Sequence, residues 1–453
     1  MVNGNYETDL KHWKGKPSPS LSSTSQTRHQ CQTTVLTWGG YNPRPCLSVT
    51  HTGKKWGMAS AHGCTTMATT KSVLISLVLA LLQLSAMVRS DSPCDFPAIF
   101  NFGDSNSDTG GLSALFSAVL PPYGRTFFGM PAGRYSDGRL TIDFMAQSLG
   151  LRYLSAYLDS IGSNFTQGAN FATAAATIRR DNGSIFVQGY SPISLVVQTW
   201  EFEQFINRSK FVYSNIGGIY REILPKPDYF SKALYTFDMG QNDLTVGYLT
   251  NMTTEQVEAY VPDVMERFAE GIQSVYRLGG RYFWVHNTAP LGCLPYAVVF
   301  RPDLAEEKDG AGCSVALNRG AQFFNARLNE TVARLRAALP DAAFTYVDVY
   351  SAKYKLISQA KKLGFGDPPL RACCGYGGGE YNLDRDIRCG ARAEVNGTSV
   401  LVGKSCEDPS RSVNWDGIHF TEAGNKFVFD QIVDGVLSDP PVPLRRACQG
   451  KGR

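Results

Sequence analysis

Histidine is scarce in this 453-residue sequence once the first ninety residues are set aside. Of the six histidines, only His286 and His419 lie in residues 91–453. Because histidine is the side chain that exchanges protons near neutral pH, a histidine base in this region is one of these two. His286 lies within the apolar run 283–286. A histidine in such a run is more often a hydrogen-bonded residue of the core or its rim than a catalytic base.

The sequence also lacks a strong charge imbalance and a zinc-binding pattern. Residues 91–453 carry 35 Lys and Arg against 38 Asp and Glu, which excludes the basic face of a general nucleic-acid binder. The adjacent Cys373 and Cys374 have no Cys-x-x-Cys spacing and no nearby histidine, so they do not form a zinc motif. With 43% hydrophobic and 19% charged residues, the composition is that of a globular protein.

No apolar run reaches the roughly 20 residues of a membrane span. The longest run follows Lys71, covers residues 72–84 and precedes small residues up to Ser90, the pattern of a secretory signal peptide over 67–90. Met67 is then the expected start, and cleavage after Ser90 gives a mature chain from Asp91 with no membrane span; cleavage after Ala86 is the other candidate. Residues 1–66 are expected to be a disordered extension or a gene-model artefact, and a real extension before an internal signal or anchor stays open.

Cysteines and glycosylation motifs agree with export. Eight cysteines follow the predicted signal, an even number that fits disulfides. Cys293 and Cys313 could close one loop and the cluster over 373–406 another, while the remaining pairs are left unassigned. Six Asn-x-Ser/Thr motifs also follow the signal, at Asn164, Asn182, Asn207, Asn251, Asn329 and Asn396. We therefore expect a secreted, extracellular glycoprotein.

Apolar segments alternate with amphipathic ones from residue 95 onward. We predict strands over 97–102, 233–239, 282–286 and 344–350, and helices over 257–275, about 315–339, and 427–436. Alternating strands and helices indicate an α/β fold with a parallel sheet covered on both faces, in a single domain over 91–453. Ligands bind beyond the carboxyl ends of such strands, where the polar turns 103–105 and 240–243 fall.

Ser105 and His419 are the candidate nucleophile and base. Ser105 directly follows the first predicted strand, and a base must take its proton before it can react. Asp416 lies three residues before His419, a spacing at which the carboxylate can fold back and orient the imidazole. The alternative for Ser105 is a helix cap. Residues 91–453 contain no Gly-x-Ser-x-Gly, so an α/β-hydrolase nucleophile elbow is absent.

Four separated blocks match one family in order: 102–110 (Phe-Gly-Asp-Ser-Asn-Ser-Asp-Thr-Gly), 168–172 (Gly-Ala-Asn-Phe-Ala), 240–243 (Gly-Gln-Asn-Asp) and 416–420 (Asp-Gly-Ile-His-Phe). The chain resembles the plant GDSL esterase/lipases of the SGNH hydrolase superfamily, and within them the early-nodulin-8-like subgroup, over about 95–440. The resemblance implies a three-layer α/β/α, flavodoxin-like fold. It also implies a catalytic triad of Ser105, Asp416 and His419, with no metal and no organic cofactor. The implied oxyanion hole comprises the N–H groups of Ser105 and Gly168 and the side-chain amide of Asn242.

The second block continues as Ala172–Thr177 where many relatives have a glycine-rich run, which leaves the shape of the acyl pocket open. We expect Asp104, Asp108 and Asn170 to stiffen loops by hydrogen bonding rather than to react. The leading interpretation is a monomeric secreted serine esterase that cleaves short-acyl or acetyl esters through an acyl-enzyme. The substrate could be an acetylated carbohydrate, a metabolite ester or a lipid. Two alternatives are a glycosidase of the α-L-fucosidase kind, which needs paired carboxylates, and a non-catalytic carbohydrate-binding or defence glycoprotein.

Overall fold

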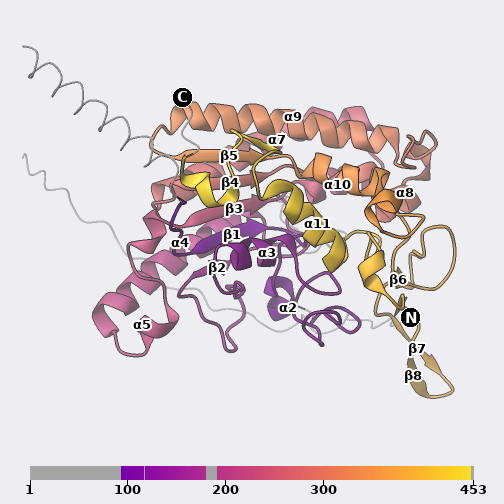
Figure 1. The fold of residues 1–453 in the computed structure, drawn as a ribbon, viewed down its shortest axis with the longest axis horizontal. Helices are drawn as coiled ribbons and strands as arrows, with labels where there is room; N and C mark the ends of the chain where they lie inside the picture. The colour runs from indigo at the N-terminus through magenta and orange to yellow at the C-terminus, as the bar shows by residue number, and fades with distance from the viewer. Residues whose placement is uncertain (1–92, 117, 180–190, 450–453) are drawn as a thin grey trace, which may run out of the picture. The chain divides into compact units, whose positions relative to one another are not determined.

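A six-stranded sheet lies at the centre of the computed structural model, which describes residues 93–116, 118–179 and 191–449 (Figure 1). The strands are β1 (Ile99–Gly103), β2 (Gly168–Asn170), β3 (Leu234–Asp238), β4 (Tyr282–His286), β5 (Ala343–Val347) and β10 (Ser438–Asp439). Their order is β10-β5-β4-β3-β1-β2, with β10 antiparallel to β5 and all other pairs parallel. The parallel order 2-1-3-4-5 is that of flavodoxin-like folds, so the predicted fold class is confirmed. The segments 1–66 and 67–90, the expected start at Asp91, and Asn182 lie outside the described residues.

Helices cover both faces of the sheet because strand side chains alternate in direction. Phe100 and Phe102 pack on one face, which is covered by α4 (Leu195–Phe211), α6 (Gln241–Leu249), α7 (Thr254–Arg277) and α9 (Val315–Ala338). Ile99 packs on the other face, which is covered by α3 (Thr141–Ser148), α10 (Val349–Ser358) and α11 (Glu422–Ile432). Figure 1 shows α7 and α9 lying side by side along the sheet.

Short elements fill the connections. These are α2 (Gly111–Leu115), α5 (Tyr220–Ile223) and α8 (Pro295–Phe300), together with the antiparallel pairs β6 (Cys374–Gly375) with β9 (Lys404–Ser405) and β7 (Arg392–Val395) with β8 (Thr398–Leu401). A π-helical turn follows α4 at Val212–Ile216, and 3₁₀ turns lie at Tyr229–Ser231, Leu291–Cys293, Pro302–Leu304, Ala360–Leu363, Pro409–Arg411 and Leu444–Gln449.

Polar caps explain where two predicted elements differ from the observed ones. The strand predicted over 344–350 ends at Val347, because the Asp348 carboxylate accepts the Ser351 N–H and begins α10. The helix predicted over 427–436 runs over Glu422–Ile432 instead, since the Thr421 hydroxyl accepts the Gly424 N–H. The first correction comes from a capping residue inside the predicted strand, and the second from one that precedes the predicted helix.

Disulfides join the eight cysteines in pairs. Cys293–Cys313 is the pair suggested by the sequence, Cys373–Cys406 and Cys374–Cys389 lie within the predicted cluster, and Cys94–Cys448 joins the two ends of the described chain. Among the Asn-x-Ser/Thr motifs, Asn207, Asn251, Asn329 and Asn396 are exposed and Asn164 is half-buried. No helix within the described ranges is both long and apolar enough to cross a membrane.

Candidate active site

Ser105 lies just beyond the carboxyl end of β1, beside β3. At this position the strand order reverses direction, and open α/β sheets bind ligands at such a point. Backbone bonding continues one residue past the strand, where the Asp104 N–H donates to the Asp238 carbonyl at 3.2 Å. Ser105 does not cap α2. The N-cap is Gly110, and the Asp108 carboxylate accepts the first two N–H groups of the helix, those of Gly111 and Leu112, at 2.5 and 3.1 Å.

Buried hydrogen bonds fix the loop that follows Ser105. Asn170, at the end of β2, donates from its amide to the Ser107 carbonyl at 2.7 Å and accepts from the Asn101 amide at 2.7 Å. The Asp108 carboxylate also accepts the Ala174 N–H at 2.7 Å. These contacts match the loop-stiffening roles expected of Asp108 and Asn170, and they bring the segment after β2 against the Ser105 loop.

The Asp416 carboxylate holds the His419 ring. Its Oδ2 lies 2.7 Å from His419 Nδ1, while its Oδ1 accepts the Ile418 and His419 N–H groups at 3.0 and 2.9 Å. Both side chains are buried. Burial raises the pKa of the Asp416 carboxyl, but the charge and hydrogen bonds of His419 outweigh it and hold that pKa below its usual value. The carboxylate therefore stays ionised and keeps the proton of His419 on Nδ1.

Tyr123 is a partner of Asp416 that the sequence did not reveal. Its hydroxyl donates to Asp416 Oδ2 at 2.8 Å, across 293 residues of chain. Burial and the neighbouring carboxylate raise the pKa of Tyr123 well above its ordinary value, so the phenol remains a donor. No local motif marks such a contact, because it depends only on the fold.

Ser105 and His419 line the same cavity, which has a volume of about 190 Å³. His419 Nε2 is buried and has no hydrogen-bond partner among the described residues. Burying a polar atom without a hydrogen-bond partner costs free energy. Here that atom, Nε2, belongs to an imidazole ring that is held through Nδ1 and lines a cavity. Asn242 and Ala175 also line the cavity, whereas no Asp or Glu of the described chain does.

Asn242 lies in the first turn of α6, directly after β3. Its Nδ2 donates to the Ala176 carbonyl at 2.9 Å, which ties α6 to the segment after β2. That bond uses one of the two N–H groups of the amide and fixes the orientation of the other. Three of the predicted site positions, Ser105, His419 and Asn242, are thus brought together at one cavity, with Asp416 behind His419.

Gly168 is not brought to this cavity. It begins β2 and pairs with Ile99 at the start of β1, so it lies at the amino end of strands whose carboxyl end leads to Ser105. Its N–H is already donated to the Phe165 carbonyl at 3.1 Å. Gly168 has φ +116°, and a Cβ there would lie 1.7 Å from the Ile99 carbonyl oxygen. The glycine permits close strand pairing, and the oxyanion role expected of it does not fit.

Ala175, in the run that follows the second block, lines the cavity together with Ala174. It has φ +63°, a left-handed conformation that is uncommon outside glycine. The sequence held one sign of this backbone conformation. Many relatives have glycines where this chain has the run Ala172–Thr177, and glycine favours a positive φ.

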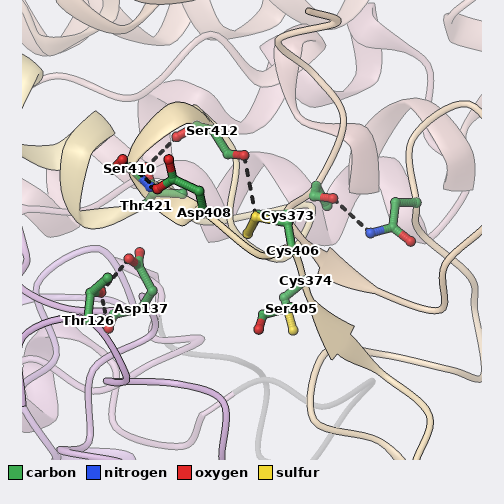
Figure 2. The surroundings of a disulfide bond; sticks show 12 residues. Thr126, Asp137, Cys373, Cys374, Ser405, Cys406, Asp408, Ser410, Ser412 and Thr421 are labelled. Carbon is green, nitrogen blue, oxygen red and sulfur yellow. Dashed lines mark hydrogen bonds between the residues drawn. A yellow bond between two sulfur atoms is a disulfide. The ribbon is translucent and has the colours of Figure 1, made fainter. Parts of the chain in front are cut away.

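Two disulfides brace the segment that carries Asp416 and His419. Cys373 and Cys374 donate their N–H groups to the carbonyls of Asn414 and Trp415, at 2.9 and 2.6 Å. Figure 2 shows the surroundings of the Cys373–Cys406 bond, where the Ser412 hydroxyl lies 3.6 Å from the Cys406 sulfur.

His286, the other histidine of the region, is occupied on both ring nitrogens. The Trp284 indole N–H donates to Nε2 at 3.0 Å, and Nδ1 lies 3.2 Å from Asp238 Oδ2. Because an indole only donates, Nε2 carries no proton and Nδ1–H donates to Asp238. His286 is therefore a neutral, buried histidine, in agreement with the core interpretation. Among the described residues, no group of three or more His, Cys, Asp and Glu side chains is placed to hold a metal ion.

Comparisons with known proteins give the same family at high identity. A model of the family described as GDSL-like Lipase/Acylhydrolase matches residues 99–432. The "GDSL esterase/lipase ACHE" of Zea mays is 72% identical over 360 residues, covering 80% of this chain and 91% of that protein. The "Alpha-L-fucosidase 3" of Arabidopsis thaliana is 54% identical over 378 residues, covering 83% and 99%. The "GDSL esterase/lipase ENOD8" of Medicago truncatula is 48% identical over 378 residues, covering 83% and 96%.

Proposed function

Since the chain belongs to the GDSL-like lipase/acylhydrolase family and is a carboxylic ester hydrolase, we propose that it is a secreted serine esterase. In this proposal Ser105, His419 and Asp416 form the triad. The observation that carries it is the shared cavity of Ser105 and His419, in which the buried Nε2 of an Asp416-oriented ring has no partner among the described residues.

The geometry supports a two-step reaction through an acyl-enzyme. Ser105 Oγ attacks the ester carbonyl carbon while His419 Nε2 takes the hydroxyl proton, and the carbonyl π electrons move to oxygen to give an oxyanion. When that intermediate collapses, the bond to the leaving alcohol breaks and His419 returns the proton to it. A water molecule then repeats the sequence on the acyl-enzyme, releasing the acid and the free Ser105 hydroxyl. Asp416 stays ionised throughout and stabilises the imidazolium.

The oxyanion needs donors fixed in advance near Ser105. We assign this role to the N–H of Ser105, the free N–H of the Asn242 amide and the N–H of Ala175, in place of the expected Gly168. Ala175 supports this assignment because it lines the cavity with Ser105 and Asn242, and the neighbouring Ala174 and Ala176 fix its backbone through bonds to Asp108 and Asn242.

A small acyl group fits the cavity better than a long chain. At about 190 Å³, its volume is below the roughly 300–1,000 Å³ of pockets that enclose drug-sized ligands. Leu112, Leu294 and Ile418 give it apolar walls. Acetyl and other short acyl esters are therefore the proposed substrates.

Secretion is supported by the redox state of the cysteines. All eight cysteines of residues 91–453 are paired in disulfides, which persist in oxidising compartments and are rare in the cytosol. A glycosidase activity, suggested by the name of one relative, is not favoured. The cavity has no carboxylate among its described lining residues, and glycosidases need two that flank the scissile bond.

A fluorophosphonate probe, which labels activated serines, tests this proposal together with a series of esters from acetyl to palmitoyl. The secreted protein should take up one equivalent of probe, located on Ser105 by peptide mapping, and hydrolyse the acetyl ester best. Ser105→Ala should abolish both labelling and hydrolysis. Ser113→Ala, in α2, is the matched control and should keep both. Labelling of another serine, or hydrolysis by Ser105→Ala, would overturn the proposed nucleophile.

A further inference from the structure

A cluster of charged groups lies next to the Ser105 loop, in which Asp104 and Lys353 are buried and Asp238 is half-buried. Asp104 precedes Ser105 and is 1% exposed, Asp238 ends β3, and Lys353 of α10 is 6% exposed. Lysine is almost never buried to this degree unless it is paired. The proposed mechanism makes no use of these three groups, so their burial requires a separate explanation.

Lys353 contacts both segments of the proposed active site. Its Nζ donates to Asn106 Oδ1 at 3.3 Å, and it lies 5.2 Å from the centroid of the Phe420 ring. Asn106 directly follows Ser105, and Phe420 directly follows His419. A single ammonium group thus connects the neighbour of the nucleophile, through a hydrogen bond, with the neighbour of the base, through a cation–π contact.

The carboxylates around Lys353 are unevenly satisfied. Asp104 Oδ1 accepts the Asn106 N–H at 2.9 Å and its side-chain amide at 3.0 Å, whereas Oδ2 is buried without a partner among the described residues. Asp238 accepts the Nδ1–H of neutral His286 at the end of β4. The positive charge of Lys353 acts on both carboxylates.

These charges alter one another's proton affinity. Burial and the charge of Asp238 raise the pKa of Asp104 to about 7, while the hydrogen bonds from Asn106 and the charge of Lys353 act in the opposite direction. Burial lowers the pKa of Lys353, and Asp238 and Asp104 counteract that effect. Burial also raises the pKa of Asp238, but the interactions with His286 and the charge of Lys353 together outweigh it and hold that pKa below its usual value.

We propose that Lys353 is a positioning residue for ester hydrolysis, which joins the Ser105 segment to the His419 segment through its hydrogen bond to Asn106 and its contact with the Phe420 ring. This inference rests on the proposed roles of Ser105 and His419. Its physical basis is that an ionised acceptor makes stronger hydrogen bonds than a protonated one. Loss of the ammonium would increase the protonated fraction of Asp104 at neutral pH and, with the loss of the bond to Asn106, would loosen the turn beside the nucleophile.

The test is the pH profile of kcat/KM for a short ester in Lys353→Met, Lys353→Arg and the wild-type protein. Removal of the cation should raise the pKa of Asp104, because a nearby opposite charge lowers a carboxyl pKa by about one unit or more. We therefore expect the acid limb of the Lys353→Met profile to move about one unit to higher pH, with kcat/KM falling roughly tenfold at neutral pH and recovering in alkali. Lys353→Arg should keep the wild-type limb.

Lys355→Met is the matched control, since Lys355 is exposed on the same helix and its ammonium group donates to Gln431, away from the Ser105 and His419 segments. Its profile should be that of the wild type. If Lys353→Met does not fold, Asn106→Ala takes its place, because loss of the Asn106 side-chain hydrogen bond also raises the pKa of Asp104 and should move the limb in the same direction. An equal loss of activity at every pH, with a lower Tm, would reduce Lys353 to a packing role and overturn the inference.

Ser105→Ala measured alongside separates the two proposals. Hydrolysis by Ser105→Ala would overturn the proposed function. Inactive Ser105→Ala together with an unshifted limb in Lys353→Met and Asn106→Ala would overturn only the positioning role.

Discussion

The two segments that meet at the cavity are held by different physical means. The Ser105 segment continues from a fully buried central strand, and its turn is fixed by the side chains of Asp108 and Asn170. The His419 segment lies outside the sheet. It folds on itself, with the Trp415 N–H donating to the His419 carbonyl at 2.7 Å, and disulfide-bonded cysteines donate to it from the side.

Because of this difference, a change in carboxylate charge and a change in cysteine oxidation should disturb different segments. Non-covalent bonds to buried carboxylates hold the Ser105 segment, so its geometry depends on the charges of Asp104 and Asp108. The His419 segment depends on oxidised cysteines at 373 and 374. An enzyme that works in an oxidising compartment can use covalent cross-links for the part of its site that the sheet does not support. Lys353 contacts both segments, Asn106 through a hydrogen bond and Phe420 through a cation–π contact.

The largest expected effect concerns whether the two segments act as one unit. Ser105→Ala and His419→Ala should each lower kcat by roughly 10⁴- to 10⁶-fold, and the double variant should be no worse than either single one. The reason is that proton transfer from Ser105 to His419 is a single step, which either substitution removes. Single-turnover kinetics on folded protein, verified by circular dichroism, measures this. Losses that multiply in the double variant would show that the two residues do not share a step.

A smaller effect is expected at Asn242, which adjoins the Ser105 segment. Asn242→Ala should lower kcat by roughly 10²- to 10³-fold with little change in KM, because a donor aimed at the oxyanion binds the transition state better than the ester. The same amide also bonds to Ala176, so a purely structural role is the alternative. That role predicts a lower Tm with kcat per folded molecule nearly unchanged. Both quantities should be measured on one sample, and a kcat loss below about fivefold would remove Asn242 from the oxyanion hole.

The sequence was sufficient for those parts of the fold and site that rest on local patterns. Apolar strands followed by polar turns predicted β1, β3 and β4, and the turns after β1 and β3 carry Ser105 and Asn242. The Asp416–His419 contact was also predictable, since a carboxylate three residues before a histidine can reach Nδ1 without help from the rest of the fold.

The remaining features depend on contacts between distant segments or on backbone geometry. Gly168 was placed in the oxyanion hole by resemblance, yet its position in the register beside Ile99 puts it at the opposite end of the strand. The contact of Tyr123 with Asp416 spans 293 residues, and no pattern encodes it. β2 has only three residues, too few to show a periodicity. For Ala175, the decisive property is a positive φ, which an alanine in the sequence does not reveal.

The smallest expected effect on catalysis tests the covalent support of the His419 segment. Replacing the Cys373–Cys406 pair with serines should lower the free energy of unfolding by about 2–4 kcal/mol. It should also lower kcat per folded molecule by roughly tenfold, equivalent to about 1.4 kcal/mol in activation free energy. The kcat loss is expected because Cys373 donates to Asn414, two residues before Asp416, so a looser Cys373 shifts the segment that orients His419.

The matched control replaces Cys94 and Cys448 with serines, which removes a disulfide between the two ends of the described chain. That variant should lose at least as much stability, since its disulfide closes a longer loop, and keep its kcat, because neither cysteine bonds to the 414–420 segment within the described residues. Thermal unfolding and initial rates well below each Tm measure the two effects separately. Equal kcat in both variants would mean that the His419 segment holds its geometry through its own hydrogen bonds, and the proposed contrast between the two segments would then be abandoned.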